Sequence, residues 1–73
     1  MNSEDKFLMQ SRVQKLTLFL MRDYGMSIPE AFGTVYNSRL YELLLNKETG
    51  LYYQGSVYLY SFLQREIKTG KVI

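Results

Sequence analysis

The chain has 73 residues, a net charge of +2, and neither cysteine nor histidine. This composition excludes disulfides, thiolate metal sites and the imidazole that most often serves as metal ligand or general base. Hydrophobic residues make up 47% of the chain, which excludes a disordered tail. We therefore expect one small domain over residues 1–73, and because its core is small, binding to a partner is the remaining way to reinforce it.

The first predicted element is a long helix over residues 4–24. Its apolar residues recur every three or four positions, as one face of a helix requires: Met9, Val13, Leu16, Leu20 and Tyr24. Ser3 is the expected N-cap, acidic residues follow it in the first turn, and Gly25 is expected to end the helix.

The opposite side of this helix also carries apolar residues. Phe7, Leu18 and Met21 lie on or near the face opposite Met9 and Leu16. A helix that is apolar nearly all round is either central in its domain or lies against another chain. We expect it to be the long central element of the fold, with its second apolar face open to either interpretation.

A short second helix is predicted over residues 28–37. Ser27 and Glu30 form a capping box, and Pro29 is tolerated in the first turn. The expected inward face is Ile28, Phe32 and Val35, flanked by Ala31 and Tyr36. Gly33 lies off this face, where it either weakens the helix by about 1 kcal/mol relative to alanine or admits another backbone.

A third helix is predicted over residues 39–46, closed by a turn at residues 47–50. Leu40, Leu43 and Leu44 share the side expected to face the core. Tyr41 and Leu45 stack on a second side, and residues 39 and 42 are spaced for a surface ion pair.

Residues 51–60 admit two interpretations. Strand-forming residues around Gln54-Gly55 are compatible with a hairpin, which would make the fold α+β. Ser56 is also a good N-cap for a helix over residues 57–68, with Gly70 as its stop. The helix explains more residues, including the shared face of Leu59, Phe62, Leu63 and Ile67. We therefore predict an all-α domain of four helices, in which residues 51–55 form a loop.

The sequence contains no arrangement typical of an active site. The glutamates lie on separate predicted segments, no serine has a base placed beside it, and there is no glycine-rich phosphate loop. We therefore expect no enzyme, and predict no cofactor, metal or small-molecule substrate.

Nucleic-acid binding is the alternative function. The helix over residues 39–46 contains only Arg39 as a base, which is unlike a groove-reading helix. Basic residues toward the ends of the first and last helices, among them Arg65, Lys68 and Lys71, are candidates for phosphate contacts, although cations near a helix C-terminus also favour the helix dipole.

The favoured function is a non-catalytic protein-interaction or regulatory module, self-associating or part of a small complex. It rests on apolar residues that the simplest core leaves unused, since exposed apolar patches mark protein contacts. These predicted interaction residues are Phe7, Leu18, Met21, Tyr41, Leu45, Tyr52 and Tyr53. Residues 2–6 do not read as a secretory leader and no apolar run is long enough for a membrane span, so we expect a cytoplasmic location.

Residues 26–66 carry a resemblance to short bacterial proteins. The features are Met-Ser-x-Pro-Glu-Ala-Phe at 26–32, Val-Tyr-Asn-Ser at 35–38, Glu-Thr-Gly-Leu-Tyr at 48–52 and the last aromatic helix. In these features the chain resembles small all-helical proteins of unknown function found beside toxin–antitoxin-type genes. The resemblance implies a small binding or regulatory partner, and no activity or site residues.

Overall fold

The structure, a computed structural model, describes residues 3–70 and consists of helices and turns. The four helices are α1 (Ser3–Tyr24), α2 (Ile28–Tyr36), α3 (Arg39–Leu45) and α4 (Ser56–Thr69), with two short 3₁₀ turns, η1 (Lys47–Thr49) and η2 (Leu51–Tyr53), between the last two. The predicted all-α class is confirmed.

The hairpin alternative for residues 51–60 is wrong, since no strand occurs within residues 3–70. Gly50 adopts the left-handed conformation that begins the tight turn of η2. Its carbonyl accepts a hydrogen bond from the Tyr53 amide at 3.1 Å, and the Leu51 carbonyl accepts one from Gln54 at 2.9 Å. Local turns thus satisfy the backbone groups that a hairpin would have paired across strands.

Most predicted helix ends are confirmed. Both hydrogen bonds of the Ser27–Glu30 capping box are present, and Gly25 and Gly70 follow the ends of α1 and α4 with positive φ. Two caps differ: Ser3 and Ser56 are each the first residue of their helix, and Gly55 rather than Ser56 is the N-cap of α4. The expected ion pair on α3 forms, at 3.3 Å between Arg39 and Glu42.

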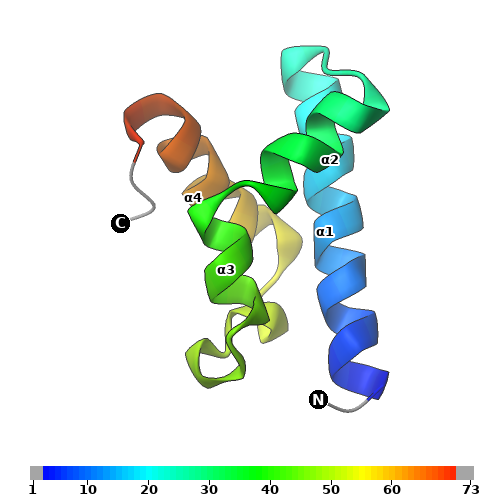
Figure 1. Ribbon diagram of the computed structural model, residues 1–73, viewed down its shortest axis with the longest axis vertical. Coiled ribbons are helices and arrows are strands. Elements are labelled where there is room, and N and C mark those ends of the chain that lie inside the picture. The colour runs from blue at the N-terminus through cyan, green and yellow to red at the C-terminus, as the bar shows by residue number, and fades with distance from the viewer. Residues whose placement is uncertain (1–2, 71–73) are drawn as a thin grey trace.

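Helix α1 lies along one side of the molecule instead of in its centre (Figure 1). Helices α2 and α4 and the turn η2 pack against the face of α1 that carries the buried residues Met9, Leu16 and Leu20. The expectation of a central α1 is therefore wrong, because no element within residues 3–70 covers the opposite face at Leu18, which is 51% exposed.

The core uses fewer of the large apolar side chains than predicted. In α2, the small residues Ala31 and Val35 are buried, whereas Ile28 and Tyr36 are exposed. Small residues let two helices approach closely, so Ala31 and Val35 face the core. Phe32 packs at the edge of the core, and Ile28 and Tyr36 face solvent. Tyr24 and Ile67, near helix ends, are also exposed rather than inward-facing.

Helix α4 holds the N-terminus of α3 in place through Glu66. The Glu66 carboxylate accepts hydrogen bonds from the backbone amides of Arg39 at 2.7 Å and Leu40 at 3.1 Å. The Ser38 hydroxyl accepts a third from Tyr41 at 3.1 Å. Amides at the start of a helix lack partners within it, so these oxygens satisfy three of them and fix α3 against α4.

Candidate protein-interaction site

The predicted interaction residues lie in four separate places, one of which is the pair of tyrosines in η2. Phe7 and Leu18 project from the uncovered face of α1, and Phe7 is 70% exposed. Tyr41 and Leu45 lie on α3 beside α1, Tyr41 half-buried and Leu45 exposed. Met21 is half-buried against the core. The predicted residues thus do not form one continuous patch.

The two tyrosines of η2 have opposite environments. Tyr52 is 1% exposed, and Tyr53 is 63% exposed, although their ring centroids are only 4.4 Å apart. Burial, together with hydrogen bonds to Tyr53 and Asp5, raises the pKa of Tyr52 to about 12. Tyr52 is therefore a core residue that closes the base of the domain, and it does not contribute to a binding surface.

The clearest concave feature lies between α1 and the α2–α3 pair. We call it the aromatic groove and define it by the residues that line it: Lys6, Met9, Gln10, Val13, Gln14, Phe32, Tyr36, Tyr41 and Leu45. Its volume is about 600 Å³, within the range of about 300–1,000 Å³ of sites that bind ligands.

One wall of the aromatic groove is a connected row of rings. Phe32 and Tyr36 stack at 5.9 Å between centroids, and Tyr36 meets Tyr41 edge-on at 4.9 Å. Leu45 continues the row one turn further along α3. Ring pairs in these geometries stabilise one another, so the wall is an ordered surface.

The opposite wall and the floor come from α1. Met9 and Val13 are buried at the base, while Lys6, Gln10 and Gln14 recur every four residues and are exposed. Residues four apart lie on one side of a helix, so the three long side chains form a polar edge beside an apolar floor. Such an arrangement suits a ligand with one apolar and one polar face.

Sequence reasoning found Tyr41 and Leu45 but missed the rest of this groove. The sequence predicts that Phe32 and Tyr36 face inward. Residues 28, 32 and 36 are spaced as one side of a helix, but so are residues 31 and 35, and spacing does not tell which set is buried. The available signal was that Ala31 and Val35 are the smaller pair, which favours them at a close helix–helix contact.

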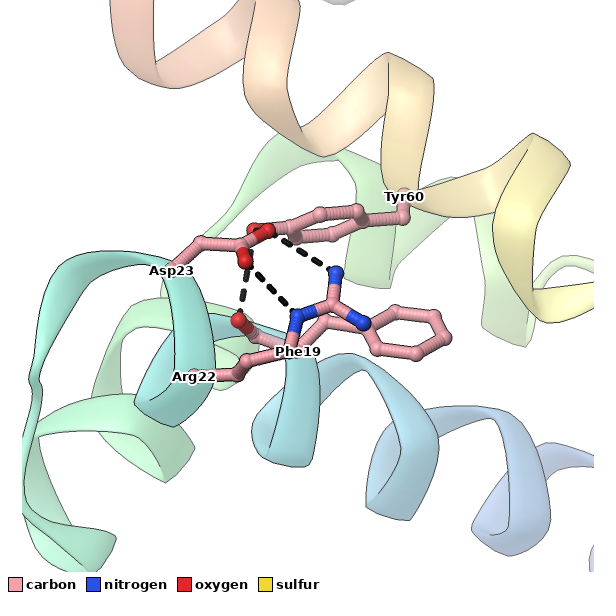
Figure 2. Close-up of polar contacts among 4 residues, drawn as sticks. All are labelled: Phe19, Arg22, Asp23 and Tyr60. Atoms are coloured by element: carbon pink, nitrogen blue, oxygen red, sulfur yellow. Dashed lines mark hydrogen bonds and ion pairs between the residues drawn. The ribbon is translucent and has the colours of Figure 1, made fainter.

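A polar network near the C-terminal end of α1 connects it to α4 (Figure 2). Asp23 accepts two hydrogen bonds from the Arg22 guanidinium, at 2.7 and 3.0 Å, and one from the Tyr60 hydroxyl at 2.8 Å. The Phe19 ring lies 5.0 Å from that of Tyr60 and 4.9 Å from the Arg22 guanidinium carbon.

The hydrogen bonds and the burial of this network determine the protonation states of Asp23 and Tyr60. The Arg22 and then the Tyr60 hydrogen bond lower the pKa of Asp23 to about 2, and burial raises the pKa of Tyr60. At neutral pH the carboxylate is therefore ionised and the phenol neutral. Because each is already engaged by the other elements of the network, the cluster fastens two helices together and is not arranged for proton transfer.

The buried carboxylate of Asp5 connects the N-terminal end of α1 to the turn η1. Asp5 is only 3% exposed, and its Oδ2 lies 3.3 Å from Lys47 Nζ. Sequence reasoning placed Asp5 in the first turn as a partner of the helix dipole. The structure adds contacts with Tyr52 and with η1, which connect the start of α1 to the turns below α3.

Three of the basic residues form ion pairs with carboxylates. Arg22, Arg39 and Lys47 are each engaged by a carboxylate, and these three lie on different elements. Arg65 and Lys68 are exposed on α4, and Lys71 lies outside the described residues. The ion pairs make Arg22, Arg39 and Lys47 less available for the phosphate contacts of the nucleic-acid alternative.

The fold and the groove define a small all-α domain with one ordered aromatic surface. Comparison of the chain with protein-family models, with curated proteins and with solved structures finds no match. Within residues 3–70, no helix has the length and hydropathy needed to cross a membrane.

Proposed function

We propose that this protein is a non-catalytic protein-interaction module, acting in a small complex or by self-association, and that it binds through the aromatic groove. The observation that carries the proposal is the connected wall of Phe32, Tyr36, Tyr41 and Leu45 above a buried apolar floor. In this wall Tyr36 and Leu45 are exposed, and Phe32 and Tyr41 are half-buried. Aromatic side chains in ordered concave surfaces are the commonest anchors of protein interfaces.

The size of the chain supports the same proposal. Without disulfides, a 73-residue domain has a small core, yet this one leaves aromatic side chains in solvent when it could have used them for folding. Burying such side chains against a partner would stabilise both the complex and the fold.

A matched pair of double variants tests the proposal. Tyr36→Ser with Leu45→Ser removes two exposed side chains from the groove. Tyr58→Ser with Val57→Ser removes a comparable exposed pair from α4, outside the groove. Each tagged full-length chain is used to capture partners from its source cells, with and without nuclease, and its mass in solution is measured by sedimentation.

We expect a stoichiometric protein partner, or a dimer, that survives nuclease and the α4 double variant but is lost in the groove double variant. Circular dichroism would check that both variants remain helical. Equal behaviour of the two variants would refute the groove as the binding surface. Recovery of nucleic acid, with all proteins lost after nuclease, would favour the nucleic-acid alternative.

A further inference from the structure

We infer that the aromatic groove receives an amphipathic helix of a different protein, and that this helix carries a carboxylate that pairs with Lys6. The inference rests on the proposed function and names the chemistry of the partner.

The absence of strands in the described chain excludes one conformation of the partner segment, and the apolar floor of the groove favours another. Within residues 3–70 there is no sheet edge to which an extended peptide could add a strand. A segment that enters the groove is then most stable when it satisfies its own backbone hydrogen bonds, since the described chain offers it no strand to pair with. A helix does so internally, and helix-in-groove binding is a recurrent mode of peptide recognition.

The dimensions of the groove determine how much of that helix makes contact. Its α1 edge runs from Lys6 to Gln14, about 12 Å at 1.5 Å per residue. That length matches about two turns of a bound helix. We therefore expect apolar anchors at positions i, i+3 or i+4, and i+7, directed at Met9, Val13 and the aromatic wall.

The charge of the groove determines the polar chemistry. Lys6 is the only charged residue among those that line it, and it lies at one end, beyond the neutral Gln10 and Gln14. Lys6 forms no ion pair within the part of the chain that the structure describes. A carboxylate at the corresponding end of the bound helix complements this exposed ammonium group, in a domain whose net charge is +2.

The same charge argues against a second copy of this chain as the occupant. In a two-fold symmetric dimer the same patch meets itself, so the residues that line one groove face those that line the other. Because the lining residues include no carboxylate, neither Lys6 would then meet an acidic side chain of the other groove. A helix of another protein can supply the carboxylate that a second groove lacks.

A peptide display library tests the inference with the full chain as bait. Helical 14-residue peptides carry leucines at i, i+3 or i+4, and i+7, and the remaining positions are randomised among Glu, Gln and Lys. Selection is repeated with Lys6→Glu and Lys6→Gln. Lys15→Glu is the control, because Lys15 is an exposed lysine of the same helix that does not line the groove.

We expect the unaltered chain and the Lys15→Glu control to enrich glutamate at one end of the leucine stripe. Lys6→Glu should enrich lysine at the same position, and Lys6→Gln should enrich neither. The selected peptide should bind about fivefold more tightly than its Glu→Lys version, as expected for an exposed ion pair. Its binding should shift the NMR signals of Tyr36 and Leu45.

Three results would overturn the inference: enrichment that ignores charge, an equal effect of Lys15→Glu and Lys6→Glu, or no enriched peptide at all. Dimerisation of the chain that Leu45→Glu abolishes would show that a second copy is the occupant. Each of these outcomes leaves the proposed function intact if the groove double variant still loses its captured partner or its dimer.

Discussion

At the scale of single residues, Asp23 shows how one carboxylate joins two distant segments. Its oxygens accept hydrogen bonds from neighbouring Arg22 and from Tyr60, 37 positions away in the sequence. The interaction between Asp23 and Arg22 is exposed and local, whereas the one with Tyr60 connects α1 to α4. The hydrogen bond from Tyr60 to Asp23 therefore forms only in the folded state. Because it lowers the pKa of Asp23, the stability of the domain depends on pH.

We predict that the domain loses stability as the pH falls from about 4 to about 2. The pKa of Asp23 is lowered from 3.8 to about 2 in the folded chain, so the folded state resists protonation more than the unfolded state does. The stabilisation is complete above the unfolded pKa and disappears as the pH passes below the folded one. Urea unfolding between pH 2 and pH 6 measures it.

Two variants serve as references for this prediction. Asp23→Asn should remove the part of the pH dependence of stability that comes from the Asp23 carboxylate. Tyr60→Phe should destabilise the domain by about 1–2 kcal/mol and raise the pKa of Asp23 toward its ordinary value, because a hydrogen bond to a charged group is lost. An acid transition in Asp23→Asn identical to that of the unaltered chain would contradict the assignment.

At the scale of elements, the seven-residue helix α3 depends on a side chain of α4 for its N-terminus. A helix this short is not stable alone in water. We predict that Glu66→Ala destabilises the domain by about 1–2 kcal/mol and that Glu66→Gln, which keeps an acceptor but loses the charge, costs less. Thermal unfolding measures both, and a change in Glu66→Ala no larger than at exposed Lys68→Ala would contradict this role.

Helix α2 contains a glycine that its structure does not require. A Cβ added at Gly33 would meet no atom within 4 Å, and its φ is not positive. The alternative that Gly33 admits a close backbone is therefore excluded within the described chain. We predict that Gly33→Ala stabilises the domain by about 1 kcal/mol in urea unfolding, whereas Gly50→Ala, at a left-handed position, destabilises it.

At the scale of the whole molecule, adjacent tyrosines distinguish the core from the surface. Tyr52→Ala should cost about 3–5 kcal/mol, because it empties a buried site, and this is enough to unfold much of so small a domain. Tyr53→Ala should cost less than about 1 kcal/mol. Circular dichroism and urea unfolding of both variants make the comparison, and similar losses would contradict the burial of Tyr52 alone.

The groove also belongs to this scale, because its lining comes from three helices. Tyr41 and Leu45 are neighbours on α3 and were recognised as an unused apolar pair. Met9 and Val13, at the floor of the groove, have the spacing of ordinary core residues, and both are buried. The concave surface exists because residues of α1, α2 and α3 line the same space, and helix periodicity alone does not tell how these helices lie relative to one another.

The sequence by itself determined the secondary structure of this protein and most of its helix ends. A capping box, a glycine stop and apolar spacing act within a few residues, so their physical effects can be read locally. Only the tertiary structure decided which of two helical faces α2 buries, that α1 lies at one side, and that Asp23, Glu66 and Asp5 fasten separate segments. These outcomes depend on helix packing, where the size of Ala31 and Val35 outweighs the hydrophobicity of Ile28 and Tyr36.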